Sequence, residues 1–498
     1  MALFKTSAEA KDILENQHRR SGIRPHLWAR AAFAYSLSLE SPPEDVRHDS
    51  DGKEFNEGTF FGDDEAVLMA LLRQRVGCNP PPSEIGALVK AHVERGVRQL
   101  NSHYQRVNSH TDELIRYLLS VSAVSPAPPS SQAADLLPPE HSGGSYRMAL
   151  VLGEDANAGQ PVTHVSNAPG ASPHLAIMGR NGTGKTRTAL QLLTSISESL
   201  PDVPFVVFDY AKGDIGGNAK FTSATRATVI SLPNDRVPLA PLALPFRDAN
   251  AVHLAARRFR DTISAVVRLG AVQKDRCLRL IQRLYDDFGD RTPDLTDLAT
   301  LAEQEYELEG LKADSLLACL REFATFPLFR PADEGYEHEL FRRPHVIDVH
   351  LLPEDLRKLC VFLVLDRLHA ETMSLPDAPR DDSGHTQTRL VIVIDEAHHY
   401  LACRQPTLRN LIREARSKGV VLWLLSQSPD DFDQPEYNFA KEMGLSMVFS
   451  CVVEKPKMLE AVLGGKVDPT RVSFLPTGVA LARPTGTTAP IEVRAWEP

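Results

Sequence analysis

The chain has few cysteines, and they are not arranged for a shared site. Its six cysteines are scattered over 498 residues, and no two of them form a C-x-x-C pair. We therefore expect neither a zinc site nor a disulfide framework. The seventeen histidines, including the His398-His399 pair, show no metal-ligand spacing, so we interpret them as surface or core residues.

Long apolar runs and an excess of basic residues are also missing. No run approaches the length that spans a bilayer, and the first residues carry no apolar segment typical of a signal peptide. We therefore expect a cytoplasmic protein without membrane association. The formal net charge of −10 does not indicate a nucleic-acid binder, which usually carries a basic patch, and does not exclude one. A small basic surface could still bind nucleic acid, because binding depends on how the charges are distributed over the surface and not on their sum.

Composition and apolar patterning divide the chain into three parts. Residues 1–121 carry mainly helix-like patterns, and residues 122–145 are rich in Pro, Ser and Gly, which is typical of a linker. In residues 146–498, short apolar runs alternate with helix-like stretches, which predicts a largely parallel α/β sheet. Residues from about 245 to 335 look mostly helical, and we expect them to form an insertion between strands.

One segment has the complete pattern of a phosphate-binding loop. Residues 179–186 match G-x-x-x-x-G-K-[ST], with an apolar run before them and a helix-forming run after them. Glycines allow backbone N–H groups to face a polyphosphate, and the following helix adds a favourable dipole. We expect Lys185 to reach the terminal phosphates and the Thr186 hydroxyl to hold Mg²⁺. A glycine-rich turn without nucleotide is the alternative. The candidate nucleotide-binding residues are Gly179, Arg180, Asn181, Gly182, Thr183, Gly184, Lys185, Thr186 and Thr188.

Polar side chains follow two other apolar runs. Residues 390–394 read Leu-Val-Ile-Val-Ile and are followed by Asp395 and Glu396. A carboxylate at the end of a buried strand beside a phosphate loop can hold Mg²⁺, and a second one can polarise the attacking water. We assign the metal to Asp395 and the general-base role to Glu396; the alternative is a solvated acidic turn. Gln427, after the run 420–426, is a candidate sensor of the terminal phosphate, or a polar strand end without a role.

The combined motifs resemble the HerA/FtsK superfamily of P-loop ATPases. The segment 208–214, Phe-Asp-Tyr-Ala-Lys-Gly-Asp, is similar to their D-x-K-G-[DE] segment, with one extra residue before the Lys. Residues 411–419, Leu-Ile-Arg-Glu-Ala-Arg-Ser-Lys-Gly, followed by the run to Gln427, resemble the R-E-A-R-K-x-G…Q segment of HerA-type ATPases. Residues 148–153 resemble the stretch before their phosphate loop. The resemblance covers roughly 147–498 and implies a RecA-like P-loop ATPase core.

Members of this superfamily act as hexameric rings that move duplex DNA, and the resemblance implies the same here, with ATP and Mg²⁺ as cofactors. A ring places the nucleotide between subunits, so that a neighbour must supply positive charge to the transferred phosphoryl group. Arg413 and Arg416 are candidates for this role, because arginine binds oxyanions with two donors. Both could instead be solvated charges on a helix. The large N-terminal β-barrel of HerA proteins has no counterpart in this sequence.

The first part of the chain resembles the DndE family of bacterial DNA phosphorothioation systems. The similarity rests on residues 22–37 and 51–62 and covers about 3–120. DndE proteins are small helical oligomers associated with DNA, especially nicked duplex. The resemblance therefore implies a DNA-binding and assembly domain. Its candidate phosphate contacts, which could also be a solvated basic face, are Arg19, Arg20, Arg24 and Arg30.

Together these features predict an α/β protein, a RecA-like core with a helical insertion preceded by a small mainly α-helical domain. We expect an ATP-hydrolysing DNA translocase or helicase-like motor in a phosphorothioation-linked modification or anti-phage defence system. Double-stranded DNA, further copies of the chain and other phosphorothioation or restriction proteins are the expected partners. No nuclease motif is visible, so we expect any cutting of DNA to belong to another subunit. The alternative is an ATP-dependent DNA-binding switch, or a scaffold that recruits partners without processive translocation.

Overall fold

The chain divides into two compact units, Met1–Ser131 and Gln132–Pro498. The predicted linker, 122–145, lies outside the described residues except for Ser145, and so do positions 107–121 of the predicted helical part. The computed structural model describes residues 2–21, 23–38, 43, 49–62, 65–76, 80–106, 145–244, 249–289, 291–331, 338–403 and 405–496.

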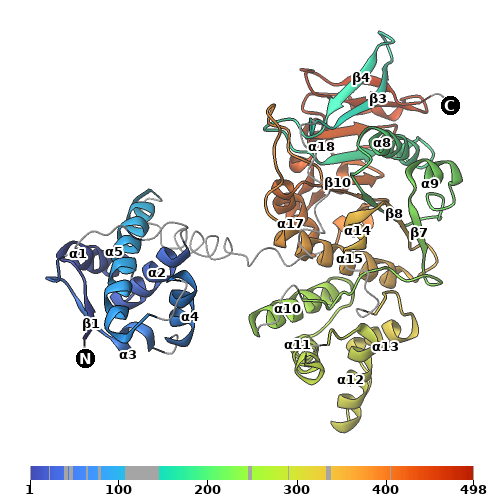
Figure 1. Cartoon of the computed structure of the whole chain (residues 1–498). Helices are drawn as coiled ribbons and strands as arrows, with labels where there is room; N and C mark the ends of the chain where they lie inside the picture. Colours follow the sequence, from blue (N-terminus) through green and yellow to red (C-terminus); the bar gives the residue numbers. More distant parts are fainter. Residues whose placement is uncertain are drawn as a thin grey trace. The chain divides into compact units, whose positions relative to one another are not determined.

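The N-terminal unit is mainly helical (Figure 1, blue). Its core centres on phenylalanine rings: the ring centroid of Phe4 lies 5.4 Å from that of Phe55 and 5.1 Å from that of Phe60. A Cβ atom on Gly96 would lie 1.9 Å from the Ala32 carbonyl oxygen, so this glycine permits the close crossing of α2 and α5. The elements are β1 (Ala2–Lys5), α1 (Ala8–Ser21), α2 (Pro25–Ser38), β2 (Glu54–Asn56), α3 (Glu57–Phe61), α4 (Glu65–Val76) and α5 (Pro82–Arg106).

An eleven-stranded sheet organises the second unit, in the order β4-β3-β15-β14-β13-β5-β10-β9-β6-β8-β7. The strands from β13 to β7 in this order are parallel, and those from β4 to β14 pair antiparallel. The carboxyl ends of the parallel strands therefore meet at one edge of the sheet. The strands are β3 (Ala149–Asp155), β4 (Pro161–Val165), β5 (Leu175–Met178), β6 (Phe205–Asp209), β7 (Thr228–Ser231), β8 (His345–Asp348), β9 (Leu390–Ile394), β10 (Val420–Ser426), β13 (Leu445–Val448), β14 (Val479–Ala482) and β15 (Ile491–Arg494).

Helices cover both faces of the parallel strands, so alternate residues of one strand enter different cores. Leu175 and Ile177 of β5 pack in the cluster that includes α8, whereas Ala176 and Met178 belong to the cluster of α15. A strand buried on both faces reads as a continuous apolar run, as the sequence shows. The helices beside the sheet are α8 (Lys185–Ser199), α9 (Ala219–Thr225), α14 (Glu339–Arg342), α15 (Glu354–Ser374), α16 (His398–Leu401), α17 (Pro406–Glu414), α18 (Pro456–Leu463) and α19 (Pro469–Ser473).

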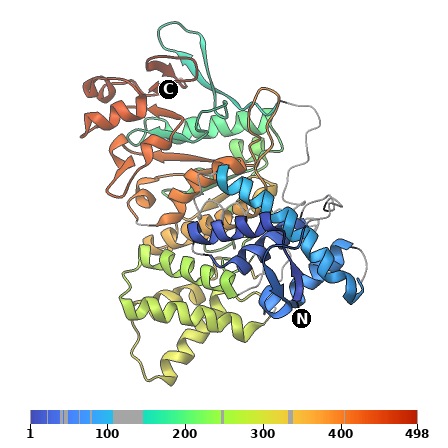
Figure 2. The same cartoon turned by 90° about the vertical axis from the view of Figure 1, so that its left-hand side faces the viewer.

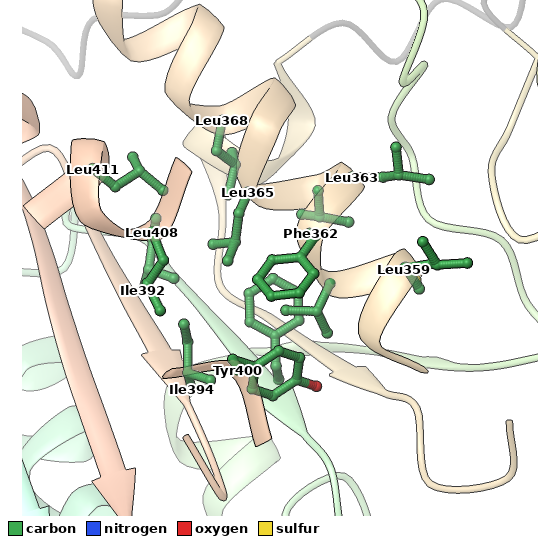
Figure 3. Packing of buried hydrophobic residues seen from close by; sticks show 14 of the residues in the cluster. Leu359, Phe362, Leu363, Leu365, Leu368, Ile392, Ile394, Tyr400, Leu408 and Leu411 are labelled. Carbon is green, nitrogen blue, oxygen red and sulfur yellow. The ribbon is translucent and has the colours of Figure 1, made fainter. Parts of the chain in front are cut away.

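Helix α15 supplies a large part of one core. Figure 3 shows Phe362 and Leu365 of α15 directed toward Ile392 and Ile394 of β9, with Tyr400 of α16 beside them. Each of these side chains is at most 1% exposed. This packing fixes the end of β9, which carries the predicted acidic pair. Short elements complete the unit: η3 (Ala415–Lys418), η4 (Pro429–Phe432), β11 (Asp433–Gln434), β12 (Tyr437–Asn438) and η5 (Phe439–Glu442).

Between β7 and the short helix α14, the described residues form four longer helices. Figures 1 and 2 show them (yellow-green) gathered at one end of the unit, next to α15. They are α10 (Ala249–Val266), α11 (Ala271–Phe288), α12 (Leu295–Leu308) and α13 (Ser315–Thr325). None of the helices within the described ranges has both the length and the apolar character needed to cross a membrane.

A buried polar junction joins these helices to the core. The Asp366 carboxylate on α15 accepts hydrogen bonds from the hydroxyls of Thr262 on α10 and Thr407 on α17. The Gln405 amide nitrogen donates to Asp366 Oδ1 at 3.0 Å. Burial raises the pKa of Asp366 to about 6, because a charged carboxylate loses its hydration there. This junction fixes the first inserted helix against α15 and α17.

Candidate functional site

The predicted phosphate loop joins β5 to α8, at the edge of the sheet where the parallel strands end. Gly184 is the N-cap of α8, so the first free N–H groups of the helix face the loop. Gly182 and Gly184 have φ angles of 81° and 112°, in the region that glycine adopts without steric cost. The local sequence therefore builds the concave row of backbone donors that a polyphosphate requires.

Lys185 is folded back over this loop. Its Nζ donates to the Gly179 carbonyl at 2.7 Å, and the side chain is buried. Burial lowers the pKa of Lys185, and the charges of Glu396 and Asp395 oppose that change. Both carboxylates thus act on the ammonium, which places the predicted acidic pair beside the loop.

Asp395 follows β9, which is separated from β5 by β10 alone. Its side chain is buried, and its pKa is raised to about 7, chiefly by burial and in part by the charges of Glu396 and Asp209. Oδ1 of Asp395 has no hydrogen-bond partner among the described residues. A buried carboxylate oxygen without a donor fits a hard cation such as Mg²⁺, which takes oxygen ligands and pairs with one or two carboxylates plus phosphates.

Glu396 and Gln427 meet across the ends of β9 and β10. The Gln427 amide nitrogen donates to Glu396 Oε2 at 3.0 Å, and Nδ1 of His398 lies 3.2 Å from the same oxygen. Glu396 has a φ angle of 47°, in the left-handed region that disfavours a non-glycine residue. The structure therefore brings together Lys185, Asp395, Glu396 and Gln427.

Asp431 is a part of this site that sequence reasoning missed. Its Oδ2 accepts hydrogen bonds from the Ser426 hydroxyl at 2.6 Å and from the N–H groups of Gln427 and Ser428 at 3.2 and 3.0 Å. The carboxylate thereby fixes the turn that presents Gln427. The signal was available, because a Ser three residues before an Asp is typical of a capped turn.

The other loop side chains have different environments. Arg180 is turned away from the loop centre, because its Nη2 donates to Ser450 Oγ at 2.6 Å and to the Ser473 carbonyl at 3.2 Å. The Thr183 hydroxyl donates to the Arg180 carbonyl at 2.7 Å. Thr188 Oγ1 is buried without a hydrogen-bond partner among the described residues. Asn181 and Thr186 are exposed and half-buried, respectively.

The segment after β6 forms a second acidic corner at the same edge. Oδ2 of Asp209 accepts hydrogen bonds from the N–H groups of Ile215 at 2.8 Å and Gly216 at 3.4 Å, which closes the loop around exposed Lys212. Burial raises the pKa of Asp209, and the charge of Asp348 at the neighbouring strand end adds to the effect. The sequence motif predicted this loop but not its pairing with β8.

Arg413 and Arg416 do not reach the phosphate loop of their own chain. Both are exposed, on α17 and η3, and neither has a hydrogen bond or ion pair within the described residues. They precede β10, whereas Gln427 follows it, so the strand length separates them from the site by about 20 Å. This position is compatible with a role on a neighbouring molecule and excludes one on their own phosphate loop.

The candidate DNA contacts lie at the corner between α1 and α2. Arg19, Arg20 and Arg24 are exposed there. The pKa of His26 is lowered by burial and then by the charges of Arg30 and Arg24, so positive charge gathers at this corner.

Arg30 has a structural role within the same unit. Its Nε donates to the Phe60 carbonyl, and its Nη2 donates to the Thr59 carbonyl at 3.3 Å. These bonds use part of the guanidinium to hold the end of α3. Among the described residues, no group of three or more His, Cys, Asp or Glu side chains could hold a metal ion.

Comparisons with known proteins agree with the two-part organisation. Residues 4–108 match the family model of the DNA sulphur modification protein DndE. The chain is similar to DndE from Escherichia coli B7A, which is involved in DNA phosphorothioation modification, with 25% identity over 20% of this chain and 92% of that one, and a TM-score of 0.18. No curated protein matches the chain.

Two solved ATPase-fold structures resemble the larger part. VirB4 of Thermoanaerobacter pseudethanolicus has a TM-score of 0.56 and 17% identity, over 72% of this chain and 97% of that one. The plasmid coupling protein TrwB, in complex with a non-hydrolysable GTP analogue, has a TM-score of 0.42 and 17% identity, over 70% and 95%. The similarity to VirB4 confirms the predicted α/β fold class with a P-loop core, and the elements α1 to α5 form the mainly helical part before it.

Proposed function

We propose that this chain is an ATP-hydrolysing motor that moves along duplex DNA in a DNA phosphorothioation-linked modification or defence system. The observation that carries the proposal is the meeting of Lys185, Asp395, Glu396 and Gln427 beside the phosphate loop. The DndE match at residues 4–108 supports the link to phosphorothioation. We further propose that the chain works as a ring of copies, with six as the expected number.

The site residues divide the work of hydrolysis. Thr186 and Asp395 would hold Mg²⁺, which supplies charge neutralisation for the phosphates when bound. Lys185 would exchange its bond to the Gly179 carbonyl for the terminal phosphates. Glu396 would accept the proton of the attacking water, and Gln427, which already donates to Glu396, would hold that water in line. Arg413 and Arg416 would stabilise the transferred phosphoryl group of a neighbouring copy.

The basic corner of the N-terminal unit would hold DNA phosphates. Arg19, Arg20 and Arg24 are exposed for such contacts. Phosphate contacts of this kind give affinity without sequence preference. Base recognition would then belong to other phosphorothioation or restriction proteins, which we propose as partners.

Phosphate release by the full chain, with and without duplex DNA, tests the enzyme proposal. We expect DNA to stimulate release, and Glu396→Gln to lower the rate at least about a hundredfold while nucleotide still binds, because a general base contributes on that order. Lys185→Ala should lose binding as well. Arg380→Ala removes an exposed arginine from the loop before β9 and serves as the matched control. Equal rates in the parent and all three variants would refute the ATPase.

Displacement of a DNA triplex separates a motor from a switch. A motor that moves along duplex DNA strips the third strand in an ATP-dependent manner, whereas Glu396→Gln should leave it bound. Hydrolysis by the parent without any displacement would instead favour an ATP-dependent DNA-binding switch or scaffold.

A further inference from the structure

Trp496 lies against the phosphate loop, although nearly the whole sheet-forming sequence separates the two. It follows β15, which pairs with β14 and β3. The Ala495 N–H donates to the Gly478 carbonyl at 2.8 Å, and the Gly478 N–H lies 3.4 Å from the Thr183 carbonyl. Two backbone links therefore connect the residue before Trp496 to the loop itself.

The indole occupies the place where a side chain on Gly184 would lie. A Cβ atom added to Gly184 would be 2.3 Å from both Cζ2 and Nε1 of Trp496. Gly184 begins α8, and one turn of that helix brings Arg187 to the same indole, with its guanidinium carbon 4.1 Å from the ring centroid. The aromatic ring thus stands at the first turn of α8.

Part of this indole has no partner in the chain. Trp496 is half-buried, and its Nε1 is buried without a hydrogen-bond acceptor among the described residues. A buried indole N–H usually finds an acceptor, because leaving it unpaired costs the hydration that it has lost. The ring nitrogens of a nucleobase and the oxygens of its ribose are acceptors of the right kind.

The order of strands gives the direction of a bound nucleotide. The loop follows β5; Asp395 and Glu396 follow β9 on one side of it, and Trp496 follows β15 on the other. Hydrolysis requires the terminal phosphate to point toward Asp395 and Glu396. The nucleoside, at the opposite end of the triphosphate, must then leave the loop toward β13, β14 and β15, where the indole lies.

We propose that Trp496 is the stacking residue for the base of a nucleoside triphosphate bound at this loop, with a purine favoured by its larger ring. The inference rests on the proposed function, because it requires a nucleotide at the loop. The indole face supplies base-independent attraction, and Nε1 donates to the nucleoside. Gly184 is required for a second reason besides its φ angle, since any side chain there would displace the indole.

Binding of ATP and of inorganic tripolyphosphate to the full chain tests this role, because tripolyphosphate carries the phosphates without a base. Calorimetry should show that Trp496→Ala lowers the affinity for ATP about tenfold and leaves the affinity for tripolyphosphate unchanged, as expected for one lost base stack. Trp496→Phe should keep most of the ATP affinity. Phe474 offers a matched aromatic control, because it is 80% exposed and follows Ser473, whose carbonyl accepts a hydrogen bond from Arg180. Phe474→Ala should change the affinity for neither ligand.

Each other outcome would overturn the proposal in a recognisable way. An equal loss for both ligands in Trp496→Ala and Trp496→Phe would show that the indole only supports the loop. Tighter binding of both would show that it blocks the loop. A loss of ATP affinity in Phe474→Ala alone would show that the base stacks on Phe474 instead. A parent chain that binds neither ligand, or that binds them as Lys185→Ala does, would refute the proposed function together with the inference.

Discussion

Glu396 keeps a backbone conformation that its side chain does not favour. Its φ angle of 47° places it in the left-handed region, where a Cβ atom crowds the following carbonyl oxygen. Such a residue persists when the surrounding structure fixes it, and here the strand end and Gln427 do so. The strain holds the carboxylate beside the phosphate loop at some expense of stability.

We predict that Glu396→Gly stabilises the fold while it abolishes hydrolysis. Glycine adopts this φ angle freely, so the free energy of unfolding should rise by about 0.5–1 kcal/mol relative to Glu396→Gln. Both variants lose the carboxylate, so the difference between them isolates the backbone effect. Chemical denaturation monitored by circular dichroism measures it, and a lower stability of the glycine variant would contradict the explanation.

At this scale the sequence predicts residues that belong to local motifs and misses those that long-range pairing supplies. Lys185, Asp395 and Glu396 each follow an apolar run, and parallel strands bring such ends together. Trp496 could not be assigned, because its position depends on the pairing of β15 with β14 and β3. The roles of the individual site residues stay predictions that the variants above test.

Among the elements, β5, α17 and β10 are joined by one buried histidine. The His174 Nε2 lies 2.8 Å from the Ile412 carbonyl, and its Nδ1 accepts the Leu422 N–H at 3.0 Å. This pair of bonds requires a neutral ring with its proton on Nε2. The pKa of His174 is lowered to about 4, chiefly by burial and in part by the charge of Arg416.

We predict that His174 makes the fold sensitive to acid. Its folded-state pKa lies below the ordinary 6.5, so its stabilising contribution is complete above that value and is lost as the pH falls toward 4. Between pH 7 and pH 5 the loss should be about 2 kcal/mol in the free energy of unfolding. Urea unfolding at both pH values measures it. If His174→Gln shows the same loss of stability, the loss belongs to other groups, such as His164, whose pKa burial also lowers to about 4.

The sequence predicts elements well where burial is two-sided and poorly where it is not. The apolar run before residue 179 and the runs 390–394 and 420–426 each form a strand, because strands covered by helices on both faces are continuously apolar. The strands β4, β7 and β15 were not predicted. The exposed and half-buried residues of β4, with its burial pattern eBeBi, and of β15 dilute the apolar signal at the antiparallel part of the sheet.

For the whole molecule, the positions of Arg413 and Arg416 bear on the proposed ring, since on our proposal one chain alone would lack these arginines at its own site. Both are exposed at the end of the sheet opposite Gln427. Without an arginine from a neighbouring copy, the proposed transition state of phosphoryl transfer would lack a stabiliser that is worth several powers of ten in rate in enzymes that use one. A ring of copies would complete each site from its neighbour.

We predict that mixing two inactive variants restores hydrolysis. Arg416→Ala should bind nucleotide but lose turnover, and Glu396→Gln should do the same for a different reason. In a mixed ring, a site from the arginine variant can receive the intact arginine of the other, so phosphate release should exceed the sum of the two alone. Arg413→Ala, mixed in parallel, identifies which arginine acts. The absence of recovery at every ratio would argue against a shared site.

The division of the chain into a helical part, a linker and an α/β part could be predicted from composition and apolar patterning. The number of copies that assemble could not. The match of residues 4–108 to the DndE model agrees with the helical pattern found there. The helices α10 to α13 lie within the segment whose mostly helical pattern predicted an insertion. Ring size depends on surfaces between copies, which no pattern within one sequence records.

The placement of β5 at the centre of the sheet has a consequence during synthesis. Its two hydrogen-bonded neighbours, β10 and β13, begin at Val420 and Leu445, long after β5 itself has left the ribosome. Until those segments emerge, the strand that carries the phosphate loop has open edges and no fixed register. For most of its translation the nascent chain therefore lacks the strands that fix the phosphate loop, and a product that ends before Leu445 would never form the pair between β5 and β13.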